Sequence, residues 1–187
     1  QVSQYVGRGV DSGAFHAVWG GMNDIFTQLV LVQSGQSTVA QAQAAVAQAA
    51  TQYVQQVAAL QAAGANQIVV LNLPDFGKTP FGVATGPANA AQISAIVSLY
   101  NTTVQTGLNA VGGNVIRADT SALLNDVLAN PAAYGLTNTT QRACGSTTSL
   151  LCTPANLVAP NANQTYVFAD DVHPTGGTHV ILAQAVA

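Results

Sequence analysis

The chain has 187 residues, of which 49% are hydrophobic, so it is globular rather than disordered. Four basic and seven acidic residues give a formal net charge of −3, which argues against nucleic acid or an anionic membrane surface as a partner. The chain has no run of roughly 18 apolar residues, so no segment is expected to span a membrane. We expect a single domain over residues 1–187.

The first strand predicted from the sequence covers residues 14–19, an apolar run that ends at Gly20 and Gly21. Residues 1–13 are polar and glycine-bearing, which is typical of a loop or a helix end. A helix is predicted to begin at Met22. The first strand is therefore followed directly by a glycine turn and a helix.

Two long helical patterns alternate with two further strands. Residues 38–63 and residues 89–111 each carry apolar side chains at helical spacing. Residues 67–73 and 114–118 are rich in β-branched side chains, and a helix is expected over residues 120–129. This alternation predicts an α/β fold with a parallel sheet, covered on both faces by helices, that binds ligands at the C-terminal strand ends.

The segments at residues 75–87 and 131–165 are predicted to be irregular, and the second contains both cysteines, Cys144 and Cys152. Their spacing does not match a metal site. We expect a local disulfide, which implies an oxidising compartment. The alternative is a pair of buried free thiols in a cytosolic protein.

The stretch that starts after a predicted strand at residues 166–168 concentrates the ionisable side chains of the chain. It reads Ala169-Asp170-Asp171-Val172-His173-Pro174-Thr175. An aspartate three residues before a histidine can orient that histidine as a general base, so Asp170 and His173 are a candidate catalytic pair. Alternatively, the acids cap a terminal helix that begins at Pro174.

Two segments of the chain resemble the GDSL family of esterases and lipases, the SGNH hydrolases. Residues 18–25, Val-Trp-Gly-Gly-Met-Asn-Asp-Ile, are similar to the third conserved block of that family. Residues 168–175, Phe-Ala-Asp-Asp-Val-His-Pro-Thr, are similar to the fifth block, and residues 71–75 resemble a strand between the two. The alanine-rich, charge-poor composition most resembles the passenger domains of autotransporter esterases from Gram-negative bacteria.

The resemblance implies a three-layer α/β/α, flavodoxin-like hydrolase that cleaves small ester or lipid substrates without a cofactor. His173 would be the general base, and Asp170 would hold its imidazole in the required tautomer. Asn23 would donate its amide to the oxyanion, and Gly21 would keep the turn small so that Asn23 can approach. Asp24 would instead bond backbone N–H groups of the helix that follows.

Other ionisable residues are weaker candidates for a catalytic role. Asp171 is the competing acid, two residues from His173. His179 is expected to face elsewhere on the last helix, and His16 to be a packed or edge histidine. A metal site formed by Asp170, Asp171 and His173 is disfavoured, because three ligands within four residues strain one coordination sphere.

The family's serine nucleophile lies in a Gly-Asp-Ser-Leu block that precedes the asparagine block, and no such block is present here. Ser12 is rejected as a replacement, because it precedes the predicted strand at residues 14–19 whereas Asn23 follows that strand. We therefore expect the C-terminal two-thirds of a family domain, incomplete at its N-terminal side because the protein was truncated, processed or nicked.

Such a fragment would leave the strand at residues 14–19 free to pair with an N-terminal fragment or a second chain. On its own it would be nearly inactive toward esters. The alternative function is a catalytically inactive α/β binding or assembly domain. The expected location is secreted, or at the bacterial outer membrane or cell surface.

Overall fold

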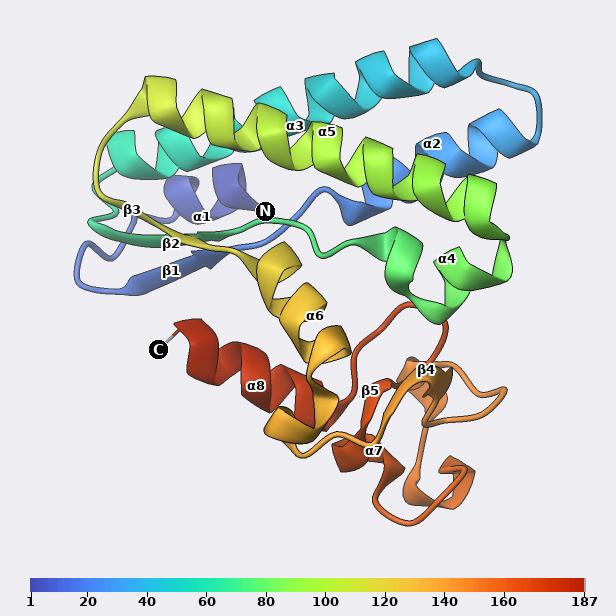
Figure 1. The fold of residues 1–187 in the computed structure, drawn as a ribbon. Coiled ribbons are helices and arrows are strands. Elements are labelled where there is room, and N and C mark those ends of the chain that lie inside the picture. The colour runs from blue at the N-terminus through green and yellow to red at the C-terminus, as the bar shows by residue number, and fades with distance from the viewer. Residues whose placement is uncertain (187) are drawn as a thin grey trace. The chain divides into compact units, whose positions relative to one another are not determined.

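The computed structural model describes residues 1–186 (Figure 1). The chain divides into two compact units: unit 1 comprises Gln1–Leu73 and Ala95–Asp119, and unit 2 comprises Pro74–Ser94 and the chain from Thr120 onward. The boundary crosses helix α5, Pro87–Val111, between Ser94 and Ala95. The expectation of one domain over residues 1–187 stays a prediction.

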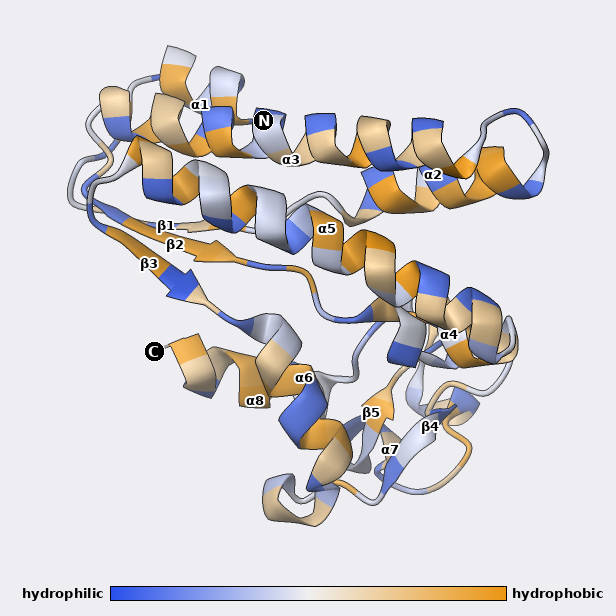
Figure 2. Ribbon diagram, turned by 45° about the horizontal axis from the view of Figure 1, so that its top comes forward, coloured by the Kyte–Doolittle hydropathy of each residue, from blue (hydrophilic) through white to orange (hydrophobic). Residues whose placement is uncertain are grey.

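Unit 1 is built on a parallel sheet with strand order β1-β2-β3. The strands are β1, Phe15–Val18, β2, Gln67–Leu71, and β3, Val115–Ala118. The central strand β2 is buried from its second residue onward, and Figure 2 shows hydrophobic colour along it. These strands confirm the predicted α/β class with a parallel sheet, because each follows a helix or leads into one.

Strand β1 is an edge strand, pairing with β2 alone among residues 1–186. Its alternate side chains are exposed, including Phe15 at 53%, and Trp19 just beyond the strand is 44% exposed. An edge strand of this kind presents unpaired backbone groups together with apolar side chains.

The helices of unit 1 are α1, Val2–Gly7, α2, Met22–Gln33, α3, Val39–Ala62, and the part of α5 from Ala95. In both ribbon views, α3 and this part of α5 lie over the same face of the sheet (Figures 1 and 2). Helix α3 begins at a capping box in which Thr38 and Gln41 satisfy each other's backbone N–H groups. Its first residue, Val39, is consequently exposed, and the buried stripe starts one turn later.

Helices α3 and α5 approach closely at Gly107. A Cβ atom at this position would lie 2.8 Å from a methyl carbon of Val54, well inside contact distance. Val54 is therefore part of the buried face of α3. The neighbouring Tyr53 instead sends its hydroxyl group to the backbone of β1.

Unit 2 contains a two-stranded parallel sheet of β4, Asn138–Arg142, and β5, Tyr166–Phe168. Its α-helices are α4, Pro80–Ala84, the first part of α5, α6, Thr120–Ala129, α7, Ala162–Thr165, and α8, Gly176–Val186. Short 3₁₀ helices are η1, Phe76–Lys78, η2, Pro131–Tyr134, η3, Ser149–Leu151, and η4, Pro154–Asn156. Its core joins α6 to the segment just before β4 and to β5 through Leu124, Val127, Leu136, Val167 and Phe168.

Three predictions about unit 2 were wrong. The segment over residues 75–87 contains η1 and α4, because Asp75 and Thr79 each cap a helical turn. Strand β4 lies within the segment predicted to be irregular. The last helix begins at Gly176 rather than Pro174, since Pro174 forms a bridge with Phe168 and Thr175 accepts the first helical N–H from Thr178.

No helix within residues 1–186 is both long enough and apolar enough to cross a bilayer. The predicted disulfide is present: Cys144 and Cys152 are bonded across a sequence separation of eight residues.

Candidate active site

The turn after β5 brings Asp170 and His173 together. Nδ1 of His173 lies 3.0 Å from both carboxylate oxygens of Asp170. An ionised carboxylate can only accept hydrogen bonds, so Nδ1 carries the proton and donates it. The neutral ring then has its lone pair on Nε2, and no group of unit 2, as far as residue 186, is hydrogen-bonded to that nitrogen. The His173 side chain is 59% exposed and that of Asp170 only 11%, so the acid is enclosed and the imidazole is open.

The Asp170 carboxylate accepts three backbone N–H groups. Val172 and His173 donate to Oδ1 over 3.0 and 2.8 Å, and Ser149 donates to Oδ2 over 2.7 Å. Burial raises the pKa of Asp170, but these hydrogen bonds outweigh burial and hold that pKa well below its usual range. The acid is therefore ionised at neutral pH and keeps a negative charge beside the imidazole.

Backbone hydrogen bonds fix this turn to β5 on both sides of the Asp170–His173 pair, the dyad. Ala169 N–H donates to the His173 carbonyl over 2.8 Å, and Thr175 N–H donates to the Val167 carbonyl over 3.0 Å. The Asp170 carboxylate lies inside this turn rather than at the start of α8, where Thr175 provides the cap. The helix-cap explanation of the acidic pair is thus wrong for Asp170.

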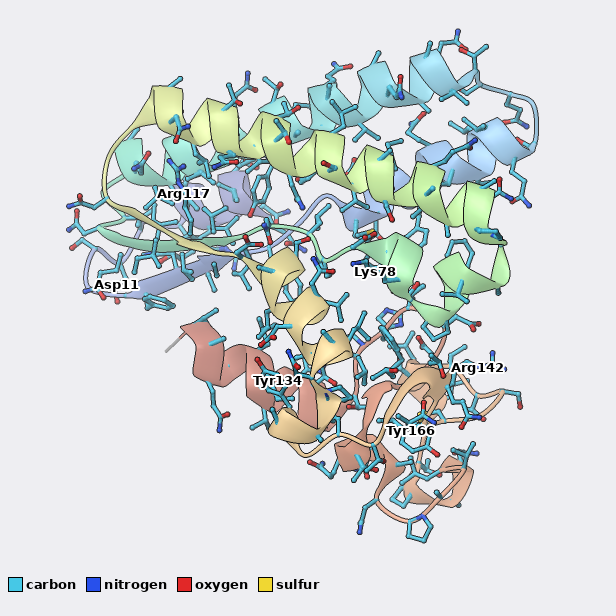
Figure 3. The ribbon with its side chains drawn as sticks, in the orientation of Figure 1. Asp11, Lys78, Arg117, Tyr134, Arg142 and Tyr166 are labelled. Atoms are coloured by element: carbon cyan, nitrogen blue, oxygen red, sulfur yellow. A yellow bond between two sulfur atoms is a disulfide. The ribbon has the colours of Figure 1, made fainter. Side chains whose placement is uncertain are left out.

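Asp171 points to a different partner. Its two carboxylate oxygens each lie 3.2 Å from the guanidinium of Arg142, which extends from β4 (Figure 3). Its carbonyl accepts the N–H of Phe81, at the start of α4. Asp171 therefore holds the turn in place, and the geometry of unit 2 leaves Asp170 as the acid that contacts His173.

In unit 1, the second predicted cluster follows the C-terminal end of β1. Gly21 is the residue before helix α2 and has φ +108°, a left-handed conformation that favours glycine. A Cβ atom there would lie 2.1 Å from the ring of Tyr100. Both the backbone angle and the available space therefore require glycine at this position.

Two tyrosines that the sequence did not single out hold this turn. The Tyr100 hydroxyl donates to the Gly20 carbonyl over 2.9 Å, and the Tyr53 hydroxyl donates to the Val18 carbonyl over 2.7 Å. Burial raises the pKa of both phenols, so both remain protonated donors. The only signal in the sequence was that each is an aromatic residue within one of the two long helical patterns.

Asn23 lies on the first turn of α2 and is exposed. Its carbonyl accepts the Thr27 hydroxyl, whereas its side-chain amide has no hydrogen-bond partner within the described chain. The amide is thus available as a donor. Asp24 also lies in the first turn of α2, but this N-terminus has no side-chain cap hydrogen bond, so the predicted bond from Asp24 to the helix backbone is absent among the described residues.

The sequence profile of the GDSL-like lipase/acylhydrolase family matches residues 1–186. The chain belongs to this family. It is 31% identical over 142 residues to the GDSL esterase/lipase At1g71691 of Arabidopsis thaliana, covering 71% of this chain and 37% of that protein. It is 27% identical over 237 residues to Lipase 1 of Photorhabdus luminescens, covering 93% of this chain and 36% of that protein.

A further relative is the GDSL esterase/lipase APG of Arabidopsis thaliana, 34% identical over 142 residues, with 67% of this chain and 39% of that protein covered. The GDSL-like chain thus spans between 36% and 39% of the length of these three relatives.

None of the described serines of unit 2 in this GDSL-like chain is bonded to Nε2 of His173. Ser149 donates its N–H to Asp170, and Ser94 donates its hydroxyl to Asp75 over 2.7 Å. Ser12, in unit 1, lies three residues before β1, where its carbonyl accepts the side chain of Asn66, whereas Asn23 follows the other end of that strand. The strand between them is roughly 13 Å long.

The other histidines of the GDSL-like chain have local partners. His16 is bonded to the Tyr5 hydroxyl and the Gln67 carbonyl, and His179 to the carbonyl of Thr175, the residue before its helix. Within residues 1–186, no group of three or more His, Cys, Asp or Glu side chains could hold a metal ion. Asp170 and His173 therefore remain the candidate acid–base pair of unit 2, and how Asn23 is placed toward them stays a prediction.

Proposed function

We propose that this GDSL-like chain supplies the base and the oxyanion donor of a serine-dependent carboxylic ester hydrolase. The observation that carries the proposal is the open Nε2 of His173, whose Nδ1 is held by the Asp170 carboxylate. A neutral imidazole oriented in this way can accept a proton from a serine hydroxyl.

In the proposed reaction, His173 takes the serine proton as the hydroxyl attacks the ester carbonyl, and Asp170 stabilises the resulting imidazolium. The unpartnered amide of Asn23 donates to the oxyanion of the tetrahedral intermediate, and Gly21 keeps the approach to that turn clear. One such donor typically lowers the barrier by about 3 kcal/mol. His173 then returns the proton to the leaving alcohol.

We propose further that the nucleophilic serine is not among these 187 residues. Ser94 donates its hydroxyl to Asp75, Ser149 contacts Asp170 rather than Nε2 of His173, and Ser12 precedes the strand that Asn23 follows. The free edge of β1, with exposed Phe15 and Trp19, would accept a strand from an N-terminal fragment or a second chain. The same free edge also favours the alternative function, a catalytically inactive binding or assembly domain.

The disulfide supports a location in an oxidising compartment, such as the exterior or surface of a bacterium. An origin as an autotransporter passenger is part of the same proposal. Small esters or lipids are the proposed substrates.

The test uses the 187-residue chain and the longest natural polypeptide that contains it. Each is treated with a fluorophosphonate probe and assayed with short p-nitrophenyl esters. We expect labelling and turnover in the longer polypeptide only. There, His173→Ala and Asp170→Asn should each lower kcat by about 10⁴-fold, and Asn23→Ala by about 10²-fold.

Asp171→Asn is the matched control, because it removes an adjacent carboxylate that contacts Arg142 rather than His173. It should keep kcat within a few-fold of the wild type. A labelled serine in the 187-residue chain would refute the external nucleophile, and folded proteins with no turnover in either form would favour the binding or assembly domain.

A further inference from the structure

One of the three N–H donors to Asp170 comes from outside the turn. Val172 and His173 belong to the same turn as the acid, and both donate to Oδ1. Ser149 lies 21 residues earlier in the chain and donates to Oδ2 over 2.7 Å. Because the two oxygens are held from different sides, rotation of the carboxylate about its Cβ–Cγ bond is blocked.

Ser149 stands inside the loop that the Cys144–Cys152 disulfide closes, as the first residue of η3. The base of this loop is also hydrogen-bonded to the residue before Asp170, because Cys144 N–H donates to the Ala169 carbonyl over 2.9 Å. The loop thus contacts two successive residues, Ala169 through its base and Asp170 through Ser149.

Hydrophobic packing does not hold the tip of this loop. Leu150 and Leu151, directly after Ser149, are 90% and 74% exposed. The position of the Ser149 N–H therefore depends on the Cys144–Cys152 link and on backbone hydrogen bonds within the loop, such as that from Thr147 N–H to the Cys144 carbonyl.

We propose that Ser149, held in place by the Cys144–Cys152 disulfide, is a positioning residue for the Asp170–His173 pair. Its N–H fixes Oδ2, so that the carboxylate meets Nδ1 of His173 with both oxygens and the open Nε2 keeps one direction. The inference rests on the proposed function for its effect on ester turnover, but its structural content concerns Asp170 alone.

The charge state of Asp170 reports on this contact. The titratable groups beside it are His173 on the same turn and Asp171, whose carboxylate pairs with Arg142 of β4. The Ser149 hydrogen bond favours the ionised form, so its loss should raise the pKa of Asp170.

The decisive variant is Ser149→Pro, which removes the N–H. Proline suits the first residue of a helical turn, and Thr148 before it has φ −67° and ψ 152°, angles that residues before proline adopt. Ser149→Ala keeps the N–H and removes only the hydroxyl, which also lowers the pKa of Asp170, so it is the conservative variant. Leu150→Ala, at an exposed neighbouring position, is the control for loop substitution.

Titration of the Asp170 carboxyl carbon by NMR in the 187-residue chain requires no ester turnover. We expect Ser149→Pro to raise the pKa of Asp170 clearly, Ser149→Ala to raise it less, and Leu150→Ala to leave it unchanged. The double variant Cys144→Ala/Cys152→Ala should behave like Ser149→Pro. In an ester-hydrolysing polypeptide, Ser149→Pro should lower kcat about tenfold and leave KM within about twofold.

An Asp170 titration that is unchanged in Ser149→Pro would overturn the proposal. If Ser149→Pro does not fold, the double cysteine variant and wild-type protein treated with reductant take its place, and an unchanged Asp170 titration in both would overturn the proposal equally. An altered titration in the 187-residue chain, together with no ester turnover in the longer natural polypeptide, would support the positioning role while refuting the proposed function.

Discussion

The ring of Tyr100 occupies the space that a side chain at Gly21 would need. A Cβ atom on Gly21 would lie 2.1 Å from the ring carbon that bears the hydroxyl group, and the same hydroxyl donates to the Gly20 carbonyl. The two residues are 79 positions apart in the sequence, yet together they define the turn that leads from β1 to Asn23.

Gly21→Ala should destabilise the protein by about 2–4 kcal/mol, because it adds both a left-handed strain and a steric clash with Tyr100. Gly64→Ala is the matched control: Gly64 has φ +99° and open space around its Cβ position. That control should cost only about 1–2 kcal/mol of backbone strain. Urea unfolding measures both, and equal losses would mean that Tyr100 simply moves aside.

Tyr100→Phe should lower the free energy of unfolding by about 1–2 kcal/mol, because the Gly20 carbonyl loses its donor. In an ester-hydrolysing form it should also lower kcat several-fold, since the turn that carries Asn23 loosens. Tyr166→Phe is the control, because the Tyr166 hydroxyl has no hydrogen-bond partner among the described residues. If Tyr100→Phe unfolds at the same urea concentration as Tyr166→Phe, the hydroxyl contributes nothing to the turn.

The low pKa of Asp170 predicts a dependence of stability on pH. A carboxyl group whose pKa is lower in the folded state contributes stability above its unfolded pKa of about 4, and this contribution is lost as pH falls toward the folded pKa. The free energy of unfolding of the wild type should therefore drop between about pH 5 and pH 2. Asp170→Asn should show a smaller drop than the wild type.

Removing the disulfide with Cys144→Ala/Cys152→Ala should lower the free energy of unfolding by roughly 2–3 kcal/mol, because the cross-link closes a short loop in the unfolded chain. Reductant should destabilise the wild type by a similar amount and leave the double variant unaffected. Identical unfolding curves for the oxidised wild type and the double variant would contradict this expectation.

Residues whose role depends on near neighbours in the chain could be predicted from the sequence. The contact of Asp170 with His173 spans three positions, and the strand, turn and helix around Gly21 follow directly from local pattern. The long helices were also predicted within about two residues, because their apolar stripes repeat over several turns.

Contacts between distant positions were not predictable. Nothing around Ser149 indicates that its N–H reaches Asp170, and nothing around Tyr100 indicates that it shapes the turn at Gly21. Strand β4 escaped prediction because its residues, Asn138–Arg142, are polar and carry no hydrophobic alternation. It forms because its backbone pairs with that of β5 beside it. The register of this pairing is irregular.

The bridge between Phe168 and Pro174 has a consequence for local opening of the protein. It closes a short antiparallel turn on β5, whose Val167 and Phe168 side chains belong to the core of unit 2. The amide protons of Ala169, His173 and Thr175 cannot meet solvent unless this core opens as well. Hydrogen exchange at these three amides should therefore be as slow as exchange in the middle of α6, which would place the dyad among the last parts of unit 2 to unfold.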